Sequence, residues 1–88
     1  MFGHKYTLAS IEELGKHNPL HETILGKVCF LSYFRRKERG CFLVDTEDEF
    51  GFMPHRIITL PVVYVEVTDD EGVIVETEDT RYTFAVIE

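Results

Sequence analysis

The chain lacks the features that would anchor a protein in a membrane or cross-link it through several disulfide bonds. Its 88 residues include no tryptophan and only two cysteines, Cys29 and Cys41. No apolar run approaches the roughly 18 residues of a transmembrane helix, and no apolar stretch follows residues 1–5 as a signal peptide would require. Two cysteines do not make a disulfide framework, so we expect a cytoplasmic protein with free thiols.

Basic residues are scarce in the second half of the chain. The formal net charge is −7, which divides into +3 for residues 1–40 and −10 for residues 41–88. Such an excess of carboxylates repels phosphate, so duplex nucleic acid is a poor candidate for the main partner. It would attract a protein with a basic surface instead. We interpret the basic turn at residues 35–39 as a solvated hairpin tip rather than a nucleic-acid patch, because it offers few phosphate contacts.

Catalytic motifs are missing as well. The sequence contains no G-x-S-x-G, no P-loop glycine pattern and no H-E-x-x-H. Cys29 or Cys41 could be paired with His55, but no third residue at a recognisable spacing would orient the imidazole. We therefore predict that the chain is not an enzyme and that it needs no cofactor.

The apolar content is sufficient for one folded domain over residues 1–88. Hydrophobic residues make up 44% of the sequence, with seven phenylalanines and four tyrosines. A chain of this size buries about 64% of its unfolded surface around a single core.

The opening segment predicts one short helix over residues 10–17. Ser10 and Glu13 fit a capping box, in which each side chain accepts a hydrogen bond from the other residue's backbone N–H. Pro19 would end this helix, because it lacks an N–H and disfavours helical geometry at the residue before it.

From residue 23 onward the sequence predicts a β-barrel. Runs rich in β-branched and aromatic residues alternate with turn residues, which is typical of short antiparallel strands. The expected strands cover residues 24–34, 41–44, 57–68, 73–77 and 82–87, and the third is bent or interrupted at Pro61. Five such strands and one short N-terminal helix indicate a mainly β (small α+β) fold, a five-stranded antiparallel SH3-like or OB-like barrel.

Two histidines suggest a metal site. His17 and His21 are four residues apart, a spacing that brings two imidazoles to one face of a helix, as in zinc sites. Pro19 would break such a helix, yet a loop could still hold zinc if His4 or a cysteine completed the ligand set.

The expected strand register keeps the two cysteines apart. If Tyr33 faces Cys41 across the turn, Cys29 lies four residues farther along, about 13 Å away at roughly 3.3 Å per residue. That distance is too long for one metal ion or a disulfide. Solvated loop histidines and buried thiols are therefore the favoured interpretation, and zinc is the alternative.

Clusters of carboxylates give the strongest functional signal. The residues expected to bind a partner are Asp45, Glu47, Asp48, Glu49, Asp69, Asp70 and Glu71. Closely spaced carboxylates on a rigid barrel can imitate a row of phosphates and occupy an arginine-lined groove. The alternatives are ordinary solubility charge and, for residues 45–51, a calcium loop, which the position of its glycine contradicts.

The segment HRIITLPV at residues 55–62 is followed by EGVIVET at 71–77 and TRYTF at 80–84. Together these segments resemble small β-rich proteins of Firmicutes and their phages. Leu60 and Asp79 stand where that pattern has serine and asparagine. Short acidic proteins of this origin include inhibitors of host defence, so the resemblance implies an anti-CRISPR protein that acts on Cas9 or a similar protein in the host-cell cytoplasm.

Our leading hypothesis is an acidic, non-enzymatic binding protein that blocks a basic nucleic-acid-binding surface of a host-defence protein such as Cas9. One alternative is a zinc-stabilised small barrel with His17 and His21 as ligands. Another is a structural phage or mobile-element module without an inhibitory role. The apolar residues Val62, Tyr64 and Ile74 are expected on the outer surface, where they would suit a homodimer interface. No membrane partner is expected.

Overall fold

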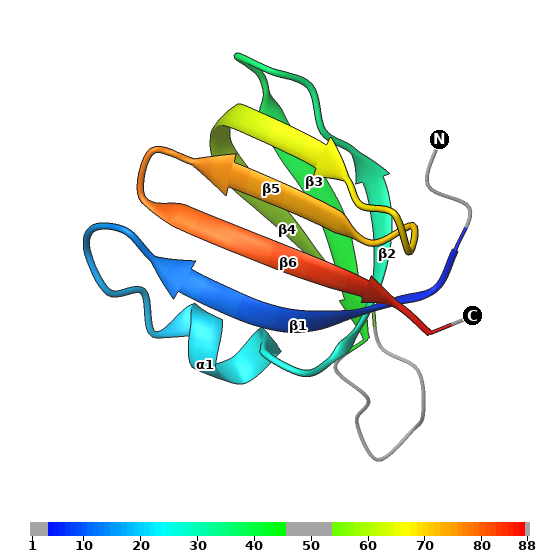
Figure 1. Ribbon diagram of the computed structural model, residues 1–88. Coiled ribbons are helices and arrows are strands. Elements are labelled where there is room, and N and C mark those ends of the chain that lie inside the picture. Colours follow the sequence, from blue (N-terminus) through cyan, green and yellow to red (C-terminus); the bar gives the residue numbers. More distant parts are fainter. Residues whose placement is uncertain (1–3, 46–53, 88) are drawn as a thin grey trace.

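The protein folds as a closed antiparallel β-barrel of six strands (Figure 1). The computed structural model describes residues 4–45 and 54–87. The elements are β1 Tyr6–Glu13, α1 Leu20–Ile24, β2 Val28–Tyr33, β3 Arg39–Asp45, β4 Pro54–Val67, β5 Val73–Thr77 and β6 Thr80–Val86. Each strand pairs with the next along the chain, and β6 returns to β1 to close the barrel. The predicted fold class is confirmed, with six strands instead of five.

The strand that the sequence analysis missed is β1. The helix predicted over residues 10–17 is wrong, because residues 10–13 continue β1 and pair with β6, from Ser10 opposite Thr83 to Glu13 opposite Thr80. Hydrogen bonds to a partner strand outweigh a local capping signal, since a helix of about two turns is marginal by itself. The barrel therefore begins at Tyr6 rather than at residue 23.

Helix α1 begins where Pro19 was expected to end one. Pro19 lies at its N-terminal boundary with φ −57°, where a missing N–H costs nothing. The Asn18 side chain accepts a hydrogen bond from the N–H of Leu20 at 3.0 Å. Gly26, with φ +81°, then turns the chain into β2. Among the described residues, no helix combines the length and the apolarity needed to cross a bilayer.

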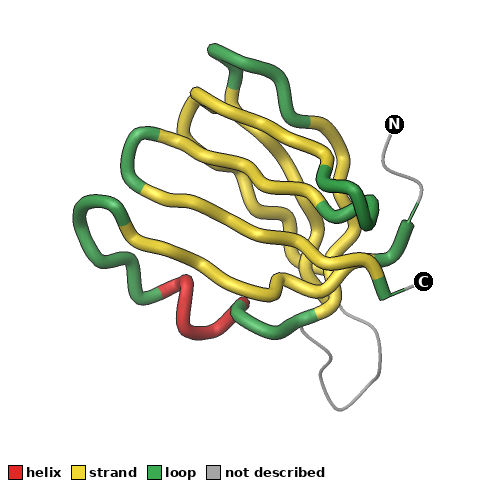
Figure 2. Tube along the Cα trace, viewed as in Figure 1, coloured by secondary structure: helices red, strands yellow, loops and turns green. Residues whose placement is uncertain are grey.

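β1 and β2 separate soon after they meet, which leaves one end of the barrel open. Only Tyr6 and Thr7 of β1 pair with β2. Farther along, β1 diverges from β2 and α1 lies beside it at the lower edge of the view (Figures 1 and 2). The buried residues of α1 are His21 and Ile24, so the helix packs one imidazole and one aliphatic side chain onto the barrel.

The interior of the barrel is centred on aromatic rings. Phe34, Phe42, Tyr82 and Phe84 contact one another, and the centroids of Phe42 and Phe84 are 5.1 Å apart in an edge-to-face arrangement. The other buried hydrophobic residues are Tyr6, Leu8, Ile24, Cys29, Leu31, Val44, Ile57, Val62, Val73 and Val75. On β5 and β6 the buried residues occupy alternate positions, as the period of two in these strands predicts.

β4 pairs with two neighbours and changes partner near Pro61. Its first part pairs with β3 as far as Pro61, and its second part pairs with β5 from Val62 onward, which agrees with the expected bend. A register shift between Val62 and Tyr64 buries Val62 to 1% exposure and leaves Val63 51% exposed. The expectation that Val62 lies on the surface is therefore wrong, because a bulge reverses the faces of a strand.

We expect Gly40→Ala to destabilise the barrel. Gly40 is buried, and a Cβ at this position would lie 2.3 Å from Cδ1 of Phe34, whose ring is packed against Phe42 and Phe84. Overpacking of this kind lowers the free energy of unfolding by about 1–3 kcal/mol. Equilibrium unfolding in urea measures the change.

Gly15→Ala is the matched control for this substitution. Its Cβ would come no closer than 3.4 Å to the Cβ of Asp79, which is ordinary van der Waals contact. We expect the control to change the free energy of unfolding by less than about 0.5 kcal/mol. Equal stability of the two variants would contradict the tight packing of Phe34 against Gly40.

Candidate functional site

The described members of the predicted acidic set lie at the two ends of β4. Asp45 ends β3 beside the start of β4, whereas Asp69, Asp70 and Glu71 lie in the turn that follows β4. Three further predicted residues lie outside the described ranges: Glu47, Asp48 and Glu49. Asp69, Asp70 and Glu71 therefore share one turn, and Asp45 lies on another segment.

Two carboxylates of the turn after β4 have local partners. Asp70 accepts hydrogen bonds from the Thr68 hydroxyl and, at 3.4 Å, from the N–H of Gly72, and these bonds lower the pKa of Asp70. Glu71 adopts a left-handed conformation with φ 66°, and its Oε2 lies 3.3 Å from Nε2 of His4. These two residues stabilise the turn, so their charge has a structural use as well.

A different group of carboxylates gathers on the outer surface of β1, β6, β5 and β4. Two rows of side chains cross these strands. In the first row Arg81 lies between Glu12 and Glu76, and Tyr64 follows Glu76. The second row consists of Ser10, Thr83, Ile74 and Glu66. Neighbouring strands are about 4.8 Å apart, so each row spans roughly 14 Å. We call these eight residues the acidic sheet face.

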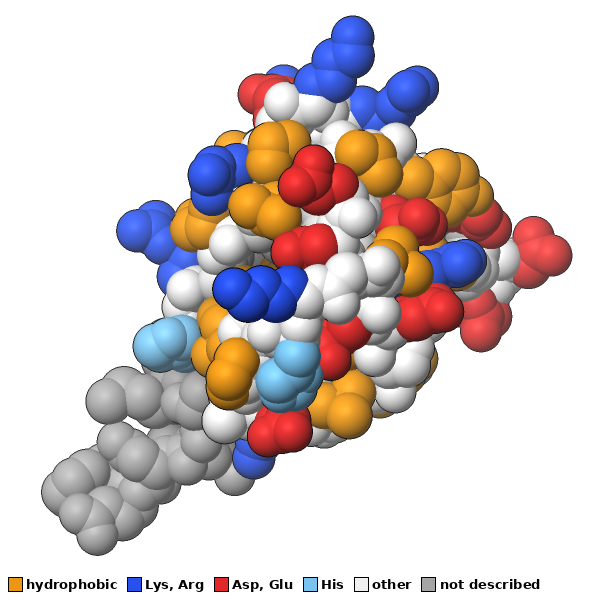
Figure 3. Space-filling model, turned by 90° about the vertical axis from the view of Figure 1, so that its left-hand side faces the viewer, with side chains coloured by type: hydrophobic (Ala, Val, Ile, Leu, Met, Phe, Trp, Pro, Cys, Tyr) orange, Lys and Arg blue, Asp and Glu red, His pale blue; other side chains and the backbone are white. Residues whose placement is uncertain are grey.

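Three carboxylates and one guanidinium give the acidic sheet face a net negative charge. Tyr64 donates its hydroxyl to Glu66, which raises the pKa of Tyr64. Figure 3 shows acidic side chains gathered toward the right-hand side of the view. Glu66 and Glu76 occupy alternate positions of predicted strands, so strand alternation could have identified them. Strand alternation could not identify Glu12, because residues 10–17 were predicted to form a helix.

The basic turn between β2 and β3 projects from another part of the molecule. The N–H of Lys37 donates to the carbonyl of Val62 at 2.8 Å, and the N–H of Val62 donates to the carbonyl of Glu38 at 2.9 Å. Arg35, Arg36 and Lys37 form no ion pair with a carboxylate of the described residues. In Figure 3 blue side chains project at the top, apart from the acidic group on the right. The turn therefore does not neutralise the acidic sheet face.

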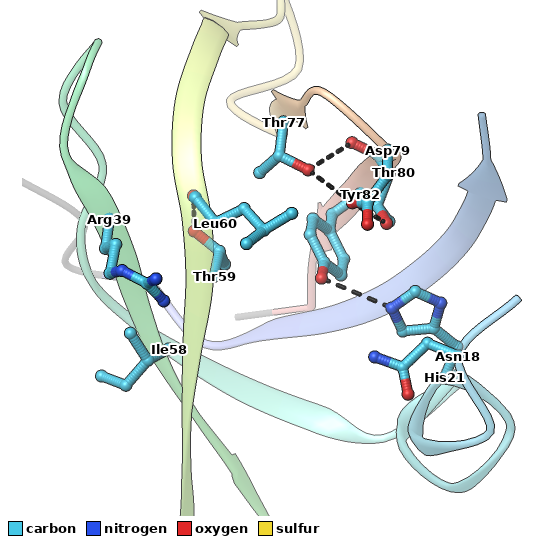
Figure 4. Close-up of a pocket in the computed structure, with 10 residues that line it drawn as sticks. All are labelled: Asn18, His21, Arg39, Ile58, Thr59, Leu60, Thr77, Asp79, Thr80 and Tyr82. Atoms are coloured by element: carbon cyan, nitrogen blue, oxygen red, sulfur yellow. Dashed lines mark hydrogen bonds between the residues drawn. The ribbon is translucent and has the colours of Figure 1, made fainter. Parts of the chain in front are cut away.

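The open end of the barrel contains a cavity of about 250 Å³ (Figure 4). The residues that line it include Arg39 of β3 and Asp79, which belongs to the turn between β5 and β6. Ile58 and Leu60 of β4 form an aliphatic part of the wall.

Threonine hydroxyls fix the polar part of the wall. Oδ1 of Asp79 accepts hydrogen bonds from Thr77 at 3.1 Å and from Thr80 at 2.9 Å. On β4, Oγ1 of Thr59 accepts from the N–H of Gly40 at 2.8 Å. The Asp79 carboxylate is thereby held at the edge of the cavity.

A carboxylate, an imidazole and a phenol form a chain that ends in this cavity. Oε2 of Glu13 lies 3.0 Å from Nδ1 of His21, and Nε2 of His21 lies 3.5 Å from the Tyr82 hydroxyl. A carboxylate only accepts, so Nδ1 of His21 donates to Glu13. The 3.5 Å separation is long for a hydrogen bond, and Thr80 is a further side-chain hydrogen-bond partner of Tyr82. Burial, and then the Asp79 carboxylate, raise the pKa of Tyr82.

Glu13 also binds the loop that precedes α1. Its Oε1 lies 2.8 Å from Nδ1 of His17, and its Oε2 accepts from the N–H of Asn18 at 2.8 Å. The hydrogen bonds from His17, Asn18 and His21 lower the pKa of Glu13 to about 2. In return, the carboxylate raises the pKa of His17. The last residue of β1 therefore ties the loop and the helix to the barrel.

Both histidines predicted as zinc ligands, His17 and His21, are directed toward Glu13. In residues 4–45 and 54–87, no group of three His, Cys, Asp or Glu side chains is arranged to hold a metal ion. The predicted pairing of Tyr33 with Cys41 is confirmed, a register shift follows it, Cys29 pairs with Val44, and both thiols are free. The zinc hypothesis gains no support from these residues.

Comparison of the chain with protein-family models, curated proteins and solved structures finds no match. The resemblance of residues 55–88 to small phage proteins stays a prediction. The geometry of the barrel itself offers two candidate sites, which are the acidic sheet face on its outside and the cavity at its open end.

The stability of the fold should depend on pH through Glu13 and His17. The pKa of Glu13 is lowered on folding, so its contribution is present above about pH 4.5 and is lost as the pH falls toward about 2. The pKa of His17 is raised, so its contribution is present below its unfolded pKa of 6.5 and is lost as the pH rises through the folded pKa. Thermal melting across this pH range measures both losses.

In His17→Gln we expect the loss of stability on the alkaline side to shrink, because the titrating imidazole is gone. His55→Gln is the control, since His55 is exposed on β4 and makes no contact with Glu13. The proposed role of His17 fails if His17→Gln and the unaltered protein lose stability equally above pH 6.5.

Cys29 should be unreactive in the folded protein. Burial raises the pKa of its thiol to about 12, so almost no thiolate forms near pH 8. Cys41 is only partly buried. A disulfide reagent should label Cys41 in buffer and both cysteines in urea, and Cys29→Ser and Cys41→Ser assign the signals. Fast labelling of Cys29 in the native protein would contradict its burial.

Proposed function

We propose that this protein is a non-enzymatic inhibitor that binds a basic nucleic-acid-binding surface of another protein through its acidic sheet face. The observation that carries the proposal is that Glu12, Glu66 and Glu76 share one outer surface on which Arg81 is the basic residue. The resemblance to small phage proteins suggests a host-defence protein such as Cas9 as the partner.

Strand pairing supports this proposal because it holds the backbone of the three glutamates at fixed spacing. Binding then orders side chains and not the backbone, so more of the interaction energy contributes to affinity. Each carboxylate can accept two parallel N–H bonds from an arginine of the partner. Tyr64, which is 42% exposed, and the half-buried Ile74 lie among them and provide apolar contact of the kind common at interfaces.

The charge of the whole chain acts in the same direction. A net charge of −7 attracts a basic surface over distances up to the Debye length, about 8–10 Å at physiological salt. The basic turn projects from another part of the molecule, so a cationic partner can approach the acidic sheet face without meeting it. Association should therefore be fast and sensitive to salt.

Charge reversal on the acidic sheet face should weaken this binding. Glu66→Lys combined with Glu76→Lys changes the formal net charge from −7 to −3. We expect association with a purified Cas9–guide RNA complex to slow by roughly tenfold at low salt, with a flatter salt dependence. Interferometry at low and high salt measures the rates, and competition with target DNA measures inhibition.

The matched control is Glu22→Lys combined with Glu38→Lys, which makes the same change of charge on α1 and at the tip between β2 and β3. We expect it to retain most of the association rate. Equal rates for the two double variants would show that the acidic sheet face is not the contact. If the unaltered protein does not compete with DNA, Cas9 is not the partner.

A further inference from the structure

We propose that the outer surface of β2, β3 and the first part of β4 binds single-stranded DNA. We call this surface the basic sheet face, and its members are outward-facing residues of three neighbouring strands: Tyr33, Arg39, Cys41, Leu43, Arg56 and Ile58. The basic sheet face shares no residue with the acidic sheet face. The proposal is therefore independent of the proposed function.

Strand pairing sets an apolar row between two arginines. Tyr33, Cys41 and Ile58 lie side by side across the three strands, and the first and last of them are 43% and 51% exposed. Arg39 precedes this row by two residues on β3, and Arg56 precedes it by two residues on β4. Because β3 and β4 are antiparallel, the two arginines lie on opposite sides of the row, about 14 Å apart. A strand that contacts both guanidiniums must pass over the row.

The basic sheet face and the turn beside it carry the opposite charge to the acidic sheet face. Two carboxylates lie in this region, Glu38 in the turn and Asp45 at the end of β3, and five cations outnumber them: Arg35, Arg36, Lys37, Arg39 and Arg56. None of the five forms an ion pair with a carboxylate of residues 4–45 and 54–87. In Figure 3 blue side chains lie at the top and the left, away from the acidic group on the right. Guanidinium groups bind phosphate through parallel N–H bonds, so the region is complementary to a nucleic-acid backbone.

The net charge of −7 does not prevent this binding, because the acidic sheet face lies on the other side of the barrel. In Figure 1 β5 and β6 lie in front of β2 and β3. The molecule measures 36 × 29 × 19 Å, so even its shortest dimension is about twice the Debye length of about 8–10 Å. Repulsion from the distant carboxylates is therefore largely screened at physiological salt, and the nearby cations decide the local potential.

The apolar row favours unpaired bases. Aromatic side chains stack on the bases of a single strand, whereas a duplex would present only phosphates, for which this surface offers few contacts. Beside the phenol of Tyr33 the row contains a thiol and an aliphatic side chain. These two groups would desolvate a 2′-hydroxyl without replacing its hydrogen bonds with water, which favours DNA over RNA.

Fluorescence anisotropy of labelled oligonucleotides with the full chain tests the choice of ligand. The probes are a DNA of 12 nucleotides with mixed sequence, its duplex, and the RNA of the same sequence. We expect the single-stranded DNA to bind at least about tenfold more tightly than the duplex, and more tightly than the RNA.

Three results would overturn the proposal. One is equal or tighter binding of the duplex or the RNA. Another is the absence of binding up to about 100 μM protein, the weak end of the range for non-specific affinity. The third is displacement of the DNA by polyglutamate of equal charge as effectively as by unlabelled DNA, which would assign the surface to an acidic protein.

A tyrosine substitution tests the apolar row. Tyr33→Leu keeps an apolar side chain but removes the ring, so we expect the affinity for single-stranded DNA to fall by roughly tenfold. Tyr64→Leu is the matched control, because Tyr64 is 42% exposed on the acidic sheet face. Tyr33 is exposed, so its variant should fold normally. Equal affinities of the two variants would contradict stacking on Tyr33.

Paired arginine substitutions test the phosphate contacts. Arg39→Gln combined with Arg56→Gln removes two contacts, so the slope of log affinity against log salt concentration should fall by about 1.4. Lys16→Gln combined with Arg81→Gln makes the same change of net charge away from the basic sheet face and should leave the slope unchanged. Both arginines of the test variant are exposed, so their loss should not unfold the barrel. Equal slopes for the two double variants would show that the basic sheet face does not hold the DNA.

Discussion

The pairing of β1 with β6 is the interaction on which the rest of the structure depends. It extends along the whole of β1, whereas β1 meets β2 at only two residues, so the barrel is closed mainly through this one ladder. The ladder sets Glu12 beside Arg81 on the outer surface and brings Glu13 to the end of the barrel, where it binds the loop and α1. Both candidate sites therefore require that β1 be a strand.

Much of the barrel could be predicted from the sequence, because alternation and turn residues are local signals. The positions of β5 and β6, the pairing of Tyr33 with Cys41 and the bend at Pro61 follow from such signals. β1 could not be found in this way, since Ser10 and Glu13 resemble a capping box and only the distant β6 reveals a strand. Val62 was predicted on the outer surface for a related reason, because no residue near it in the sequence indicates the bulge between Val62 and Tyr64.

The cavity was harder to predict than the acidic surface. Glu66 and Glu76 lie on strands whose alternation is visible in the sequence, so their outward direction follows from position alone. Arg39, Asp79 and His21 come from three separate segments and line one cavity only because the barrel closes. Their spacing along the chain does not predict that they line the same cavity. The sequence predicted partner binding by the carboxylates of the turns instead, although Asp70 and Glu71 also stabilise their own turn.

The same alternation lets neighbouring residues serve different sites. Glu12 lies in the outer row, whereas Glu13 binds His17 and His21 at the barrel end; likewise Arg81 belongs to the acidic sheet face and Tyr82 to the cavity. Salt should affect interactions at the two regions differently. Attraction between exposed charges weakens as the Debye length shortens, whereas contacts within a partly enclosed cavity are screened much less. One small barrel therefore presents a charged outer surface and a partly enclosed cavity that share no residue, so each can be changed without altering the other.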